Sequence, residues 1–177
     1  MSIWLRFIWV VVSGLFFKRP LTLSDISLLP QRVWPDELDI NVHMNNAKYL
    51  AVMDLGRTDW IVRTKARRLM TVEKMSPVVG GVIVRYRRSL KLFQRYDLKT
   101  RLLGWDERWL YIEQIMECPQ GICCIAVQRT TFTKKGKLVP PQELAAKLGH
   151  DAMAMPAPDW TRAWSETDVA MVKAAEA

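Results

Sequence analysis

Histidine and cysteine are scarce in this sequence of 177 residues, which holds only two histidines and three cysteines. Cys118, Cys123 and Cys124 lack the spacing of a metal-ligand set, and neither His43 nor His150 is paired with a cysteine. Because structural and catalytic metal sites need several such ligands at short intervals, we expect no metal. An odd number of cysteines without that spacing indicates buried thiols in a reducing compartment.

Several other sequence features are also missing. There is no internal repeat, no glycine-rich phosphate loop, and no zinc finger or other recognised nucleic-acid motif. We therefore expect no cofactor and no nucleic-acid partner. Half of the residues are hydrophobic and eight are tryptophan, which predicts an ordered chain except at its ends. The net charge of +8 favours anionic partners, among them CoA, acyl carrier protein and phospholipid headgroups.

The first 17 residues are strongly apolar, but they do not fit a membrane-spanning helix. As a helix, residues 3–17 would cover about 22 Å, less than the ~30 Å of a hydrocarbon core. No small-residue cleavage site precedes Lys18, so a signal peptide is a poor fit as well. Two alternatives remain open: a helix lying in the membrane interface, favoured by Trp4 and Trp9, and a helix packed on protein.

The stretch from Asp36 to Tyr49 has the most informative pattern. From Glu37 to Asn45 polar and apolar residues alternate, which predicts an extended segment with all the polar side chains on one side. Those polar residues are Glu37, Asp39, Asn41, His43 and Asn45. A carboxylate, an amide and an imidazole on one side are the groups that acid–base chemistry requires. A half-buried strand with a solvated outer face is the alternative interpretation.

A helix is predicted to follow from Ala47, with Asn45 and Asn46 as N-cap residues. Its apolar stripe, suited to packing on a sheet, consists of Tyr49, Val52, Met53, Gly56 and Trp60. Glycine is unfavourable inside a helix, so Gly56 indicates a close helix–sheet approach. The polar residues before this helix would therefore lie beside its unpaired N–H groups, where a developing negative charge is stabilised.

The rest of the chain predicts mainly antiparallel strands. The expected strands are 31–34, 78–90 with a bulge at Gly80 and Gly81, 96–105, 109–117 and 122–133. A short helix over 142–148, capped by Gly149, and a tail in which Trp160 and Trp164 form one amphipathic turn complete the chain. One principal helix followed by a run of strands is an α+β architecture.

The segment from Asp39 to Tyr49, DINVHMNNAKY, resembles the D-x-N-x-H-V-N-N-x-x-Y motif of plant acyl-ACP thioesterases. More broadly, the chain is similar to hotdog thioesterases of the 4-hydroxybenzoyl-CoA type. The resemblance implies a single hotdog domain over 20–149, in which an antiparallel sheet wraps a long central helix. It leaves 1–19 as an apolar N-terminal helix and 150–177 as a tail. The plant enzymes carry two hotdog repeats, so a chain with one implies a homodimer or a higher even oligomer.

The resemblance also implies an activity, the hydrolysis of an acyl-CoA or acyl-ACP thioester in fatty acid metabolism. The matched catalytic positions are Asp39, Asn41 and His43, with Asp39 as general base or nucleophile. The N–H groups near Asn45 and Asn46 would form the oxyanion site. Tyr49 matches the motif as a substrate-binding residue, with packing of the helix as the alternative role. Where the plant motif usually has Gln before its histidine, this chain has Val42.

Further expectations follow from this resemblance. Arg85, Arg87 and Arg88 would reach CoA phosphates in a hotdog protein, although surface charge is the simpler interpretation. We expect a cytoplasmic protein, with contact to the inner membrane face through 3–17. Two other functions stay open: a hotdog enoyl-thioester hydratase, and a membrane-associated module that binds acyl chains without hydrolysing them. The hydratase motif resembles D-x-N-P-x-H, with a proline and one more residue between Asp39 and His43 than this chain has.

Overall fold

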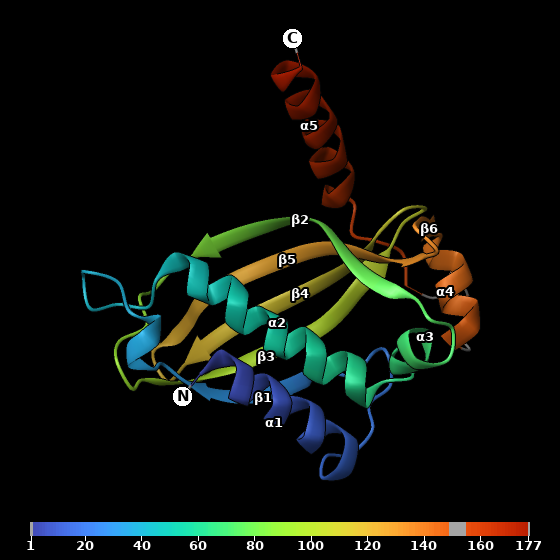
Figure 1. Cartoon of the computed structure of the whole chain (residues 1–177). Helices are drawn as coiled ribbons and strands as arrows, with labels where there is room; N and C mark the ends of the chain where they lie inside the picture. Colours follow the sequence, from blue (N-terminus) through green and yellow to red (C-terminus); the bar gives the residue numbers. More distant parts are fainter. Residues whose placement is uncertain (1, 149–154, 177) are drawn as a thin grey trace.

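A curved antiparallel sheet with a long helix laid across it forms the centre of the structure, a computed structural model that describes residues 2–148 and 155–176 (Figure 1). The elements are α1 (Ile3–Phe16), β1 (Ser27–Arg32), the short 3-10 helix η1 (Pro35–Glu37), α2 (Asn46–Arg63), α3 (Arg67–Thr71), β2 (Ser76–Tyr86), β3 (Arg95–Trp105), β4 (Leu110–Cys118), β5 (Gly121–Lys134), β6 (Lys137–Val139), α4 (Pro141–Leu148) and α5 (Trp160–Ala175).

The sheet has the order β1-β3-β4-β5-β2, with β6 paired to β5, and every pairing is antiparallel. Strands β3, β4 and β5 follow one another through short turns, which confirms the predicted meander. Helix α2 lies across the sheet, as Figure 1 shows. The expected α+β architecture, a long helix wrapped by an antiparallel sheet, is therefore confirmed.

Helix α2 packs on the sheet through the predicted stripe. Tyr49, Val52, Met53, Gly56 and Trp60 are all buried. A Cβ atom added at Gly56 would lie 2.6 Å from Thr100 Oγ1 and 2.9 Å from Gln114 Nε2. The predicted close approach of helix and sheet at Gly56 is thus confirmed, because no larger side chain fits there without moving a neighbour.

Several predicted boundaries differ from the structure. The first strand is β1, which begins at Ser27 and ends at Arg32, so the expected strand over 31–34 is wrong. Pro30 is compatible with β1 because β1 is at the edge of the sheet. Strand β2 ends at Tyr86 rather than at residue 90, and the predicted bulge is present as a register shift between Val79 and Gly81.

Helix α1 is packed on the protein, one of the two alternatives for the apolar N-terminal segment, while its contact with a membrane stays a prediction. It packs beside α2, where Gly14 lies against Val62. Its buried residues are Arg6, Val10, Ser13 and Gly14, while most of its large apolar side chains are exposed. None of the helices in the described part of the chain is both long and apolar enough to cross a membrane.

The C-terminal tail contains more regular structure than a single turn. Trp160 and Trp164 stack on each other at the start of α5, and Trp164 packs against Tyr111. The rest of α5 projects away from the sheet (Figure 1). The predicted cap at Gly149 and the predicted boundary between 149 and 150 lie outside the described residues.

The close approach at Gly56 gives a prediction about stability. Gly56→Ala should lower the free energy of unfolding by about 2 kcal/mol, because the new methyl group overlaps Thr100 and Gln114. Urea denaturation followed by circular dichroism measures this change. The sign is diagnostic, since the same substitution in an uncrowded helix would stabilise the protein by roughly 1 kcal/mol. A variant at least as stable as the wild type would contradict the packing described here.

Candidate active site

The loop between η1 and α2 carries the three residues predicted to act in catalysis. It folds back on itself, because the Asp39 N–H donates to the His43 carbonyl at 2.9 Å and the Val42 N–H donates to the Asp39 carbonyl at 3.1 Å. Leu38 and Met44 form an antiparallel bridge across its base. Val42 adopts a φ of 58°, outside the strand region. The predicted extended segment over 37–45 is therefore wrong: the segment is a tight turn.

The side chain of Asp39 explains this turn. Its Oδ1 accepts hydrogen bonds from the N–H groups of Asn41 at 2.8 Å and of His43 at 3.4 Å. Asp and Asn form such local side-chain-to-backbone bonds readily, which favours turns over strands. The alternation of polar and apolar residues consequently does not define two faces, and Ile40 is 97% exposed at the tip of the loop.

The loop brings the three predicted catalytic residues into one turn, but their side chains do not bond to one another. Asn41 is exposed and His43 is half-buried. Within the described residues, no hydrogen bond joins the side chains of Asp39, Asn41 and His43, and none of the three cavities lined by other parts of the fold includes them. In the single chain, Asn41 and the tip of the loop are exposed, whereas Asp39 is half-buried.

One polar residue of the alternating set is buried. Glu37 forms an ion pair with Arg6 of α1, and its second carboxylate oxygen accepts from the Trp34 N–H at 2.9 Å. The Glu37 carbonyl accepts from the Asn45 N–H at 2.8 Å. Glu37 thus anchors the base of the loop, a role that the alternating pattern does not predict.

The start of α2 lies directly after the loop and has the expected cap. Asn45 Oδ1 accepts from the Ala47 N–H at 2.9 Å, and the Asn45 carbonyl accepts from the Lys48 N–H at 2.8 Å. The Asn46 N–H has no acceptor among the described residues. This free donor, at the positive end of the helix dipole, is the backbone group best suited to bind a developing oxyanion.

Tyr49 packs beneath this helix start rather than facing a cavity. Its hydroxyl accepts from the Leu90 N–H at 3.3 Å, and its ring contacts Tyr86 edge-on at a centroid distance of 5.1 Å. Burial raises the pKa of Tyr49 to about 12. These contacts fit a packing role for Tyr49 and connect α2 to the segment after β2.

The three arginines predicted to reach CoA phosphates lie next to this region. The Tyr86 hydroxyl donates to the Asn46 carbonyl at 3.1 Å, which brings the end of β2 to the start of α2. Arg85 precedes Tyr86 in the strand and so points to the opposite face of the sheet. Arg87 and Arg88 follow the strand, and both side chains are exposed. Arg87 and Arg88 are therefore better positioned than Arg85 for a ligand at the helix start.

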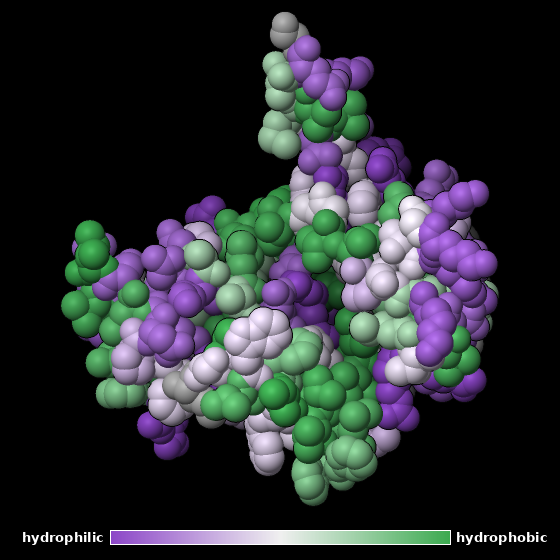
Figure 2. Space-filling view, in the orientation of Figure 1, coloured by the Kyte–Doolittle hydropathy of each residue, from purple (hydrophilic) through white to green (hydrophobic). Residues whose placement is uncertain are grey.

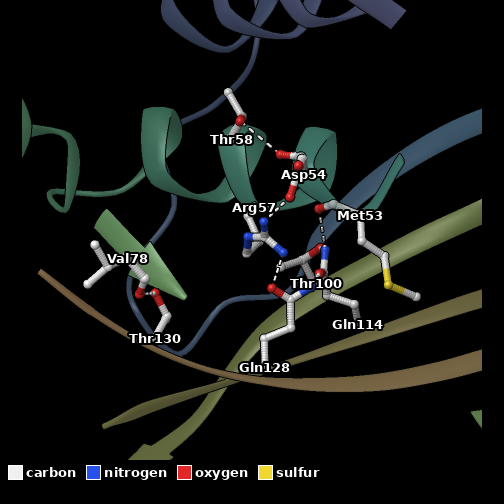
Figure 3. A network of polar contacts seen from close by, with 9 residues as sticks. All are labelled: Met53, Asp54, Arg57, Thr58, Val78, Thr100, Gln114, Gln128 and Thr130. Carbon is white, nitrogen blue, oxygen red and sulfur yellow. Dashed lines mark hydrogen bonds and ion pairs between the residues drawn. The ribbon is translucent and has the colours of Figure 1, made fainter. Parts of the chain in front are cut away.

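A buried polar network beneath α2 is a feature that the sequence analysis missed (Figure 3). Gln114 donates to the Met53 carbonyl at 2.7 Å and to Thr100 Oγ1 at 3.1 Å, and it accepts from Gln128 at 3.0 Å. Gln128 in turn accepts from Arg57, which also pairs with Asp54. The sequence signal for this network is the presence of a glutamine within each of two mainly apolar strands, Gln114 in β4 and Gln128 in β5.

The described residues include no cluster of metal ligands, and the acidic residue Glu113 faces away from α2. Among the described residues, no three His, Cys, Asp or Glu side chains lie close enough together to hold a metal ion. Glu113, an acidic residue available in β4, forms an ion pair with Arg101 at 2.6 Å. Because Gln114 faces α2, the neighbouring Glu113 points to the other face of the sheet.

Comparison with known proteins identifies the group to which this geometry belongs. Residues 33–165 match the model of the thioesterase-like superfamily. The protein THEM6 of Xenopus laevis is 40% identical over 82 residues, which are 46% of this chain and 40% of that protein. The chain covers between 40% and 58% of the length of this relative and of the THEM6 proteins of Drosophila melanogaster and Danio rerio.

Solved structures share the fold at low sequence identity. The probable thioesterase YbaW of Escherichia coli superposes with a TM-score of 0.63 at 24% identity, covering 68% of this chain and 95% of that one. The hypothetical protein SAV2348 of Staphylococcus aureus, solved in complex with CoA, superposes with a TM-score of 0.62 at 13% identity, covering 78% and 90%. The expected hotdog fold is confirmed by these likenesses.

The buried thiols near Tyr49 give a prediction about alkaline stability. Burial raises the pKa of Cys124 from 9.0 to about 12, so the folded state keeps a proton that the unfolded state releases. The free energy of unfolding should therefore fall as pH rises from 9 toward 12. Urea denaturation across this range measures how steeply the free energy of unfolding falls with pH. In the Cys124→Ala variant this slope should be shallower, by the equivalent of one proton released on unfolding. Parallel slopes for the variant and the wild type would contradict the assignment.

Proposed function

The chain belongs to the thioesterase-like superfamily, and we propose that it hydrolyses an acyl thioester of CoA or of acyl carrier protein to the free acid and the thiol. The observation that carries this proposal is the position of the Asp39 loop, directly before the N-terminus of a helix laid across a curved sheet. This loop lies within the segment matched by the family model.

Asp39 supplies the reactive carboxylate. Its Oδ1 is held by the backbone N–H groups of Asn41 and His43, while the rest of the carboxylate stays available for water or substrate. The carboxylate acts either as a general base on the attacking water or as a nucleophile on the thioester carbonyl. Both roles require its negative charge.

The other polar residues of the site assist this reaction. The thioester oxygen binds at the free N–H of Asn46, where the helix dipole stabilises the charge that develops; a backbone donor of this kind contributes ~3 kcal/mol to transition-state binding. His43 orients the water or protonates the departing thiolate. Asn41, exposed beside Asp39, holds the substrate by hydrogen bonds.

The thiol portion of the substrate is anionic. The chain carries a net charge of +8, and the exposed Arg87 and Arg88 follow the strand end that Tyr86 ties to Asn46. A neighbour of the same fold was solved in complex with CoA, which supports a phosphate-bearing substrate. The proposal includes a cytoplasmic location, since three free buried cysteines fit a reducing compartment.

The active unit is proposed to be a homodimer formed through β2. This strand pairs with β5 on one side only, and within the described chain no strand pairs with its other edge. Val79, Val82, Ile83 and Tyr86 of β2 are exposed. An exposed apolar edge is a template for pairing, and two copies of one strand meet naturally about a twofold axis. The partner would then wall in the Asp39 loop, which is open to solvent in the single chain.

Asp39 is tested by two substitutions that separate chemistry from loop structure. Asp39→Asn keeps an oxygen that accepts from Asn41 and His43 but removes the charge, so thiol release from acyl-CoA should fall by a factor of about 100 or more. Asp39→Ala removes the acceptor as well and should also be inactive. Screening acyl-CoA chain lengths for thiol release, with both variants as controls, measures the effect.

If Asp39→Asn keeps wild-type activity while Asp39→Ala loses it, Asp39 only shapes the turn and the proposed role is wrong. Crotonyl-CoA in the same assay separates thioester hydrolysis from hydration, because a hydratase removes the conjugated double bond without releasing thiol. Saturable acyl-CoA binding without thiol release, unaffected by substitution of His43, would instead favour a binding module.

The proposed dimer is tested by charging the exposed edge strand. Val82→Lys together with Ile83→Lys should convert a dimer into a monomer in light scattering, because lysine on both faces of β2 opposes pairing with a second copy. Val169→Lys with Val172→Lys, a double substitution on the projecting helix α5, is the matched control and should leave the mass unchanged. A wild-type monomer, or a dimer that survives the β2 substitutions, would refute this interface.

A further inference from the structure

Helix α1 packs on the protein with its less apolar side. Facing the domain are Arg6, Val10, Ser13 and Gly14, and Arg6 is buried in its ion pair with Glu37. Eight large apolar side chains of α1 are exposed, and so is Phe17, which directly follows the helix. The eight are Trp4, Leu5, Phe7, Ile8, Trp9, Val12, Leu15 and Phe16. Figure 2 shows the resulting apolar surface over α1, in the lower part of the view.

This orientation is the reverse of that found when a helix covers a protein core. A helix at a protein–water boundary normally buries its large apolar residues and exposes its polar ones. A contiguous exposed apolar patch of this kind marks a surface that meets a protein or a membrane. The segment that forms it precedes the region matched by the family model, which begins at residue 33.

The length of α1 determines how it would meet a membrane. Its 14 residues extend about 21 Å at 1.5 Å per residue, less than the ~30 Å hydrocarbon core. Arg6, in its first turn, is held by Glu37 on the protein side. A helix of this kind lies in the plane of the interface with its apolar side in the lipid.

The charges around α1 select the kind of surface. No acidic residue occurs before Asp25, and Arg19, just after the helix, is exposed, whereas Lys18 is paired with the buried Asp59 at 2.6 Å. The carbonyl of Arg19 accepts from the Arg63 side chain at 3.1 Å, which brings the end of α1 to the corner between α2 and α3. That corner presents three more exposed cations, Lys65, Arg67 and Arg68. Clustered cations beside an apolar helix are complementary to anionic lipid headgroups.

We propose that α1 docks this protein on the surface of a bilayer that contains anionic phospholipid, with the apolar side chains in the interface and the basic corner at the headgroups. The dimer edge β2 and α1 flank α2 on opposite sides (Figure 1), so both surfaces are available in the same molecule.

A cavity lies beside α1, next to this surface. It measures about 540 Å³ and is mostly apolar, and Phe7, Val11 and Leu15 of α1 line it together with residues of α2, α3 and β2. Resting on the proposed function, the substrate class is a thioester whose long acyl chain partitions into the bilayer on which α1 docks the protein.

The docking surface is tested by charging residues that line no cavity described here. Leu5→Glu with Ile8→Glu places two carboxylates on the exposed side of α1, where these residues are 59% and 57% exposed. The matched control is Val169→Glu with Val172→Glu on α5, at the same spacing and at 53% and 46% exposure. Each full-length protein is sedimented with vesicles of phosphatidylcholine, with and without phosphatidylglycerol.

The wild type and the α5 control should sediment with the phosphatidylglycerol vesicles, less so as salt rises, and the α1 variant should bind about tenfold or more weakly. Circular dichroism and light scattering check that the α1 variant is folded. Wild-type protein that stays in the supernatant, or an α1 variant that binds like the wild type, overturns the proposal. If the α1 substitutions instead dissociate an oligomer that ignores vesicles, the surface is a protein contact and the proposal is wrong.

A second readout separates this inference from the proposed function. Adding vesicles should raise wild-type hydrolysis of a long-chain acyl-CoA but leave that of the α1 variant unchanged, with equal rates for both proteins on a short-chain acyl-CoA. Vesicle binding without any thiol release supports the docking surface and rejects the thioesterase. Thiol release without vesicle binding supports the thioesterase and rejects the docking surface.

Discussion

The distance between α2 and the sheet is the constraint from which the rest of the structure follows. At Gly56 the helix backbone comes so near that a single methyl group would overlap Thr100 and Gln114. Gln114 then reaches both the carbonyl of Met53 in the helix and Thr100 Oγ1 in the sheet, so this buried amide is satisfied at that spacing. The position of the helix start, and with it the loop that carries Asp39, is fixed by this contact.

The surroundings of α2 are strongly asymmetric. One side rests on the sheet and a second is covered by α1. Arg57 reaches from α2 to Gln128 of the sheet; burial lowers the pKa of Arg57 to about 10, while Asp54 and Gln128 hold its charge. A guanidinium retained beside an apolar cavity is costly unless its partners are fixed. The network in Figure 3 supplies those partners, and it keeps a polar group at the wall of an otherwise apolar space.

Periodicity predicted the fold better than it predicted the loop. The stripe from Tyr49 to Trp60 and the three-strand meander are long and regular, and both were predicted because burial of apolar area decides them. The nine residues from Glu37 to Asn45 alternate equally well, yet the local bonds of Asp39 close them into a turn. Asx chemistry acts over three or four residues and overrides a pattern that only tertiary pairing could have stabilised.

The sequence also does not predict which side of α1 faces the protein. Its composition is apolar on all sides, so only the three-dimensional position of Arg6 reveals which side faces the protein. The polar network under α2 escaped prediction for a related reason, since Gln114 and Gln128 are far apart in the chain and meet only through strand register. Such pairings depend on how β4 and β5 align, which single residues do not specify.

The salt bridge between Arg6 and Glu37 has a structural consequence for the whole N-terminal region. Glu37 also accepts hydrogen bonds from the Trp34 and Asn45 N–H groups, so one residue links α1, through Arg6, to the base of the Asp39 loop. Cutting the chain ahead of Val33 would remove Arg6 and leave the Glu37 carboxylate without its ion-pair partner. Helix α1 is accordingly tied to the base of the Asp39 loop through this buried ion pair.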